Sequence, residues 1–68
     1  MAVVKVIELI GTSNSSIEDA VQSAVADAKT TLRNIKAVDI VSTGLRGENL
    51  DEWRALIRVS FLIERVSE

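Results

Sequence analysis

The side chains able to do chemistry in this 68-residue chain are arginines, carboxylates and a few serines, because it contains neither histidine nor cysteine. Nucleophilic catalysis needs an activated nucleophile and usually a base beside it. Ser13, Ser15 and Ser16 instead match positions where a strand ends and a helix is capped. A thiolate or imidazole zinc site cannot be built from this composition. We therefore predict that the chain is not an enzyme.

Arg54 and Arg58 lie four residues apart in a segment that alternates apolar and polar residues, so both project from one side of a strand. One interpretation is a polar face that meets solvent or another subunit. The other is a pair of donors for the phosphate or carbonyl groups of a ligand.

Six carboxylates are candidates for calcium or magnesium binding: Glu18, Asp19, Asp39, Glu48, Asp51 and Glu52. The run "GENLDE" lacks the spacing and the closing glutamate of an EF-hand, so a solvated hairpin is the simpler interpretation for that loop. Symmetry in an oligomer multiplies each position and would bring carboxylates of several copies together. The sequence leaves the identity of a metal site unknown.

Trp53, in "DEWRALIRVSF", is the only tryptophan. It is either a platform on which a ligand stacks or a packing residue. Its place at the head of an apolar row favours packing.

Three strands and one helix are expected to position these residues. The β-branched run 3–10 predicts a first strand that ends at "GTSNSS". A helix follows, for which Ser15 with Glu18 fits a capping box and Ser16 with Asp19 nearly does. Its apolar stripe consists of Ile17, Val21, Ala24, Ala28 and Leu32.

Asn34 tolerates a left-handed conformation and is a plausible end for the helix. Residues 35–45 then predict a second strand in which Val38 and Ile40 share a face, and residues 44–52 predict a hairpin connection. From Trp53 onward, period-two alternation through Ile63 predicts a long third strand. The order strand, helix, strand, strand predicts an α+β fold, in which a three-stranded antiparallel sheet wraps around one helix.

The length and the net charge of the chain limit its domain organisation and the partners that it can have. We expect residues 1–68 to form one domain with a thin core, since a chain this small buries only about 60% of its unfolded surface. Small chains are stabilised by disulfides, a structural metal or oligomerisation, and without cysteine and histidine we expect homo-oligomerisation. A net charge of -2 argues against nucleic acid as a partner, and "AVVKVIELIG" is too short to span a membrane and lacks a signal cleavage site. We expect a cytoplasmic protein without membrane or nucleic-acid partners.

Three stretches carry a resemblance to a known family: "KVIELIGTS" at 5–13, the capped helix leading into "AKTTLRNI", and the final "VSFLIE". Together they resemble the dodecin family over nearly the whole chain. The resemblance implies a β-α-β-β fold in which a sheet wraps a helix. It also implies that twelve copies close into a hollow sphere and bind flavins, such as FMN, riboflavin or FAD, between subunits.

The resemblance implies two ligand positions, because in flavin-binding dodecins a tryptophan stacks on the flavin ring and a glutamine hydrogen-bonds the ring. The equivalent positions here are Ala37 and Arg54, and Trp53 takes the place of a tyrosine. Loss of an aromatic stacking contact costs about 0.5 to 1.5 kcal/mol beyond the buried area. These departures resemble a branch of the family without the tryptophan, for which ion binding has been suggested.

Two functions follow from the resemblance. The first is a dodecameric protein that binds and stores or buffers a flavin or a related small molecule. The alternative is a structural or calcium-binding dodecamer without flavin.

Overall fold

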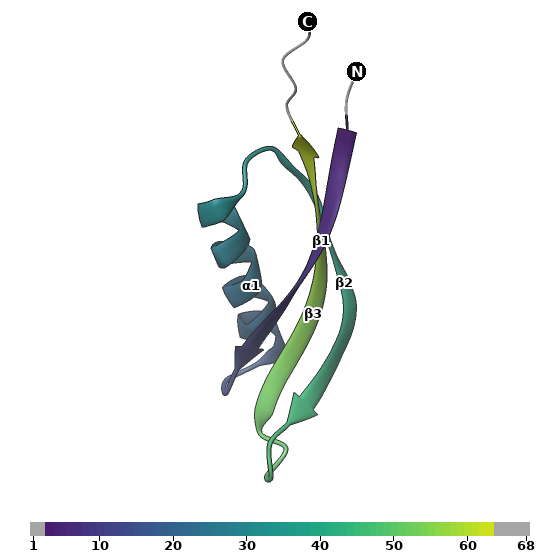
Figure 1. Ribbon diagram of the computed structural model, residues 1–68. Coiled ribbons are helices and arrows are strands. Elements are labelled where there is room, and N and C mark those ends of the chain that lie inside the picture. Colours follow the sequence, from purple (N-terminus) through teal and green to yellow (C-terminus); the bar gives the residue numbers. More distant parts are fainter. Residues whose placement is uncertain (1–2, 64–68) are drawn as a thin grey trace, which may run out of the picture.

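The computed structural model describes residues 3–63. The chain runs β1 (Val3–Ser13), α1 (Ile17–Thr31), β2 (Ile35–Arg46) and β3 (Glu52–Ile63). The three strands form one antiparallel sheet in the order β1-β3-β2, and α1 lies against one face of it (Figure 1). The predicted order of elements along the chain and the predicted fold class are confirmed.

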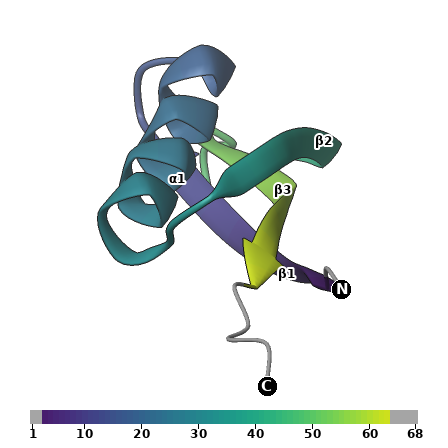
Figure 2. The same ribbon diagram turned by 90° about the horizontal axis from the view of Figure 1, so that it is seen from above.

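Strand β3 is central because it pairs with both other strands along most of its length. Its alternation places Ala55, Ile57 and Val59 toward the helix, where all three are fully buried. Viewed from above, the strands cross one another at clear angles, so the sheet is strongly twisted (Figure 2). The twist lets a narrow sheet follow the helix surface.

Alanines allow α1 to approach the sheet closely. Ala20, Ala24 and Ala28 are its buried residues, spaced one turn apart. Ala20 was absent from the predicted stripe, and Ile17 is only half-buried. The core joins Ala24 and Ala28 to Ile57 and Val59, with partly buried residues around them: Ile7, Leu9, Val21, Val25, Leu32, Ile35 and Val38.

The helix begins one residue later than the better-matching capping box predicted. Ser16 is the N-cap, and its hydroxyl accepts a hydrogen bond of 3.0 Å from the backbone N–H of Asp19. The hydroxyl of Ser13 accepts from the N–H of Ser15 at 2.9 Å and donates to the Asp19 carboxylate at 2.7 Å. Because Ser13 already organises the turn, the cap falls on Ser16 and not on Ser15.

The helix ends at Thr31, three residues before the predicted stop. Leu32 leaves the helical conformation while its N–H still donates to the Ala28 carbonyl oxygen at 2.8 Å. Asn34 does adopt the expected left-handed conformation, with φ 59°. Its carbonyl oxygen accepts a hydrogen bond of 3.0 Å from Leu62 N–H, so Asn34 shapes the entry to β2.

The strands extend beyond the predicted limits. β1 continues through Gly11 and Thr12 to Ser13, because these residues still pair with β3. β2 reaches Arg46 and β3 begins at Glu52, so the hairpin connection is shorter than the predicted 44–52. The connection bends through two left-handed residues, Gly47 and Leu50.

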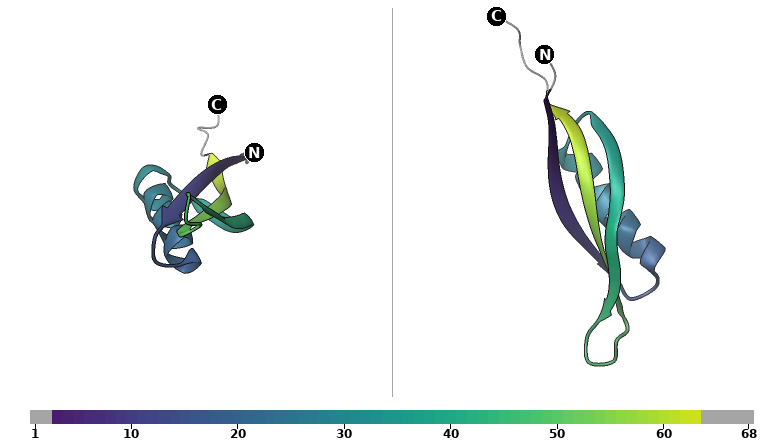
Figure 3. Two further views of the ribbon diagram at one scale, coloured as in Figure 1. Left: turned by 90° about the horizontal axis from the view of Figure 1, so that it is seen from below. Right: turned by 90° about the vertical axis from the view of Figure 1, so that its right-hand side faces the viewer.

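The face of the sheet away from α1, here called the outer face, has no covering layer within residues 3–63 (Figure 3). The described chain is also elongated, with extents of 55 × 19 × 15 Å. Its radius of gyration is 14.4 Å. A compact chain of this length would have about 11 Å. The core is therefore confined to the layer between helix and sheet.

Candidate functional site

The outer face is the candidate binding surface, because the polar side chains singled out in the sequence gather there. The register places Arg54 and Arg58 on this side of β3, and Ala37 beside Ser60 on the same side of β2. Trp53 is half-buried on the opposite side, between Ser13 and Leu45. Trp53 and Arg54 therefore lie on opposite faces of the sheet and do not form one surface.

Arg58 belongs to an ion pair. Its Nη2 atom lies 2.8 Å from Oε2 of Glu8, and its Nε donates to the same oxygen at 3.2 Å. Asp39 is its register partner on the other neighbouring strand. One carboxylate holds this guanidinium and another flanks it, which favours the polar-face interpretation for Arg58.

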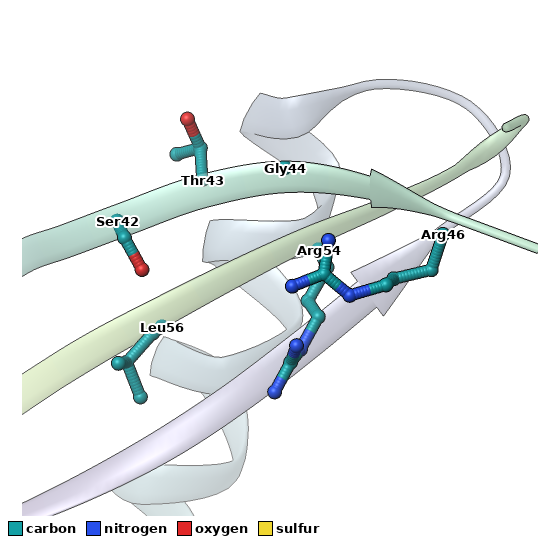
Figure 4. Close-up of a pocket in the computed structure, with 6 residues that line it drawn as sticks. All are labelled: Ser42, Thr43, Gly44, Arg46, Arg54 and Leu56. Atoms are coloured by element: carbon teal, nitrogen blue, oxygen red, sulfur yellow. The ribbon is translucent and has the colours of Figure 1, made fainter.

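Arg54 has a different neighbour, Arg46, which sequence reasoning did not single out. Both line a hollow at the hairpin end of the outer face, together with Ser42, Thr43, Gly44 and Leu56 (Figure 4). Hairpin register brings the two arginines together, since Gly44 is the partner of Arg54 and Glu52 that of Arg46. A hairpin drawn from the sequence with this register would have revealed the pair.

Ala37 and Arg54 do not meet in one chain. Ala37 is the partner of Ser60, which lies six residues from Arg54 along β3. At about 3.3 Å per residue, that separation is on the order of 20 Å. Ala37 is exposed and directly follows a bulge at Lys36.

Large apolar side chains surround these polar groups. Val4, Val6 and Ile10 on β1 are each about half exposed, at 55%, 49% and 49%. On β3, Leu62 is the register partner of Val4 and Leu56 is that of Ile10, and both leucines are half-buried. An apolar strip of this length on a small chain is typical of a surface that contacts another protein.

The candidate carboxylates are dispersed. Within residues 3–63, no three acidic side chains are grouped so that they could hold a metal ion.

Comparisons with known proteins place this architecture. The dodecin family model matches residues 3–64. A dodecin of Thermus thermophilus is 36% identical over 64 residues, covering 91% of this chain and 93% of that protein. The chain belongs to the dodecin family.

Solved structures agree with this membership. An arginine-to-alanine variant of the T. thermophilus dodecin matches with TM-score 0.84 and 34% identity, covering 96% of this chain and all of that one. The dodecin of Streptomyces coelicolor matches with TM-score 0.85 and 25% identity, covering 96% of each chain. A calcium-chelating antigen of Mycobacterium tuberculosis, called calcium dodecin, matches with TM-score 0.81 and 28% identity over 97% of each chain.

Dodecins are small-ligand-binding proteins without enzymatic activity, which confirms the prediction that this chain is not an enzyme. The M. tuberculosis relative is described as chelating calcium. The helix α1, with 15 residues, does not meet the length and apolarity needed to cross a bilayer, and no other helix occurs in residues 3–63.

Proposed function

We propose that this protein binds and stores or buffers a small molecule, a flavin or a related compound, between copies of itself in a homo-dodecamer. The observation that carries the proposal is the placement of Ala37 and Arg54, the two family-equivalent ligand positions, on one face but roughly 20 Å apart. Neither position alone encloses a ligand. Contact between outer faces of different copies would bring such positions together.

The shape of the chain supports the assembly. The outer face exposes Val4, Val6 and Ile10, and the elongated outline leaves the core as a single thin layer. Small chains gain stability by burying such surfaces against copies of themselves. Sedimentation of the purified protein should therefore give the mass of about twelve chains, and a monomer at micromolar concentration would contradict the assembly.

Flavin binding is tested by the quenching of riboflavin fluorescence. Alanine at position 37 supplies no ring to stack on the isoalloxazine, so we expect weak quenching by the natural sequence. The Ala37→Trp variant should bind riboflavin about 2-fold to 13-fold more tightly, corresponding to a gain of about 0.5 to 1.5 kcal/mol from stacking.

The matched control is Ala26→Trp, which adds the same side chain on the exposed side of α1. It should leave riboflavin affinity unchanged. Equal quenching by the two tryptophan variants, or none by either, would exclude Ala37 as part of a flavin site.

The alternative is a calcium-binding or structural dodecamer without flavin. The relation to the calcium-chelating M. tuberculosis protein at 28% identity favours it, together with the exposed acidic residues of the hairpin, Glu48 and Asp51. An ion that binds only the folded assembly raises the unfolding temperature of the assembly. Calcium, or magnesium, should then raise the unfolding temperature and a chelator should reverse the change; no response to either treatment would exclude this function.

A further inference from the structure

Charged side chains are separated along the 55 Å axis of the described chain. The hairpin connection lies at one end, where it projects beyond α1, and the connection between α1 and β2 lies toward the other (Figure 1 and Figure 3). In the hairpin connection Glu48 and Asp51 are exposed. At the opposite end, here called the basic end, four basic side chains are exposed: Lys5, Lys29, Arg33 and Lys36.

Neighbouring charges of the other sign do not cancel this separation. Residues 46–52 hold one basic and three acidic residues, which gives −2, whereas residues 29–36 hold three basic and no acidic residues, which gives +3. Arg46 and Arg54 line the hollow on the outer face, and the acidic side chains lie in the connection beyond it. The ion pair found within 4 Å among residues 3–63 joins Arg58 to Glu8 and involves neither end.

Leu50, in the hairpin connection, is exposed in an unusual backbone conformation. Its side chain is 62% exposed, the largest value among the large apolar side chains that residues 3–63 expose. Its φ of 52° lies in the left-handed region, which costs free energy for a residue with a bulky side chain. Its N–H donates to the Gly47 carbonyl oxygen at 3.1 Å and closes the turn. A strained leucine outside the core is available to pack against a partner.

The basic end presents apolar side chains that such a leucine can contact. Leu32, Ile35 and Phe61 are half-buried there, just beyond the last residue of α1. The register pairs Phe61 with Ile35 on one side and with Lys5 on the other. Apolar and basic side chains are therefore mixed at this end, as apolar and acidic side chains are in the hairpin connection.

We propose that the hairpin connection of one copy docks on the basic end of the next copy, in a head-to-tail contact within the assembly. Glu48 and Asp51 face the basic side chains, and their opposite charges orient the two copies. Leu50 packs against the half-buried apolar side chains and adds buried apolar area.

This inference rests on the proposed homo-dodecamer and adds a second contact to it. An isologous contact between outer faces joins copies only in pairs. A closed assembly of twelve therefore needs a further contact of a different kind. A head-to-tail contact passes from copy to copy until a ring closes, so each copy gives its hairpin connection to one neighbour and its basic end to another.

The test reverses the charges at each end and follows assembly by sedimentation velocity over a range of protein concentrations. Glu48→Lys with Asp51→Lys makes the hairpin connection basic, and Arg33→Glu with Lys36→Glu makes the other end acidic. Each pair of substitutions places like charges in the contact and should raise the subunit concentration needed for assembly at least about 10-fold. All four substitutions in one chain restore opposite charges and should restore assembly.

Two further variants separate the contact from net charge and from folding. Glu18→Lys with Asp27→Lys changes the net charge as much as reversal of the hairpin connection does, on exposed residues of α1 outside both contact regions. Assembly of this control should be unchanged. Leu50→Asn suits the left-handed backbone better than leucine but removes the apolar side chain, so assembly should weaken although the turn is favoured.

The outcomes distinguish this contact from the homo-dodecamer itself. A large assembly that neither pair of charge reversals weakens would overturn the head-to-tail contact and leave the homo-dodecamer standing. Weakened assembly in both pairs without recovery in the fourfold variant would overturn the pairing of the two ends. A natural sequence that sediments as a monomer would overturn both the homo-dodecamer and this contact.

Discussion

Gly11 lies on β1 where the helix and the sheet approach each other closely. A Cβ atom there would overlap the Ala20 carbonyl oxygen and would lie 3.0 Å from the Cβ of Ala24. Both obstacles belong to a packed helix, one of them to its backbone. The glycine is therefore required by packing between β1 and α1.

We predict that Gly11→Ala lowers the free energy of unfolding by about 1 to 3 kcal/mol, since the helix must shift to admit the methyl group. Gly44→Ala is the matched control, because the added methyl meets the end of the flexible Arg46 side chain. Denaturant unfolding of both variants measures the difference. Equal losses would show that helix–sheet contact at Gly11 does not decide stability.

At the scale of the element, α1 depends on the turn that precedes it. Three serines share the work there: Ser13 arranges the turn, Ser16 caps the helix, and the Ser15 backbone N–H is one of the donors to Ser13. Without the Ser16 hydroxyl, the backbone N–H of Asp19 in the first helical turn would lose its hydrogen-bond acceptor. The side chain of Ser15 is exposed.

Ser16→Ala should cost about 1 kcal/mol of unfolding free energy, the usual value for loss of an N-cap. Ser15→Ala keeps the backbone donor and should change stability little. Thermal unfolding followed by far-ultraviolet circular dichroism compares the two. A greater loss from Ser15→Ala would return the cap to the position that the sequence first favoured.

For the whole molecule, the unpartnered outer face decides how the chain is stabilised. The buried core of the chain is a single layer between the alanines of α1 and the central part of β3. Val6 represents the exposed apolar side chains of the other face and lies in one row with Ser60 and Ala37. Burial of this row between copies would add the apolar area that a single chain lacks.

Val6→Glu should therefore shift the protein from the large assembly to smaller species in sedimentation velocity, because a charge would enter an apolar contact. Ala26→Glu places the same charge on the exposed side of α1 and should leave the assembly intact. An unchanged sedimentation coefficient for Val6→Glu would show that subunits meet through another surface.

Local patterns determined the elements of this protein. Period-two alternation from Trp53 to Ile63 identified β3, and the apolar stripe that begins at Ile17 identified α1, since both signals arise within a few neighbouring residues. Element ends were predicted less well. Pairing carried β1 through the polar residues Thr12 and Ser13, which composition alone marks as a turn.

Tertiary structure decided which side chains meet. Glu8 reaches Arg58 across fifty residues of sequence, and Arg46 joins Arg54, because β3 pairs with both neighbours in one particular register. Two irregularities in β2, at Lys36 and Val41, shift that register by one residue each. A shift of one residue exchanges the faces of a strand. The sequence by itself determined which residues were available for binding, and the register assigned Arg58 to an ion pair and Arg54 to the hollow.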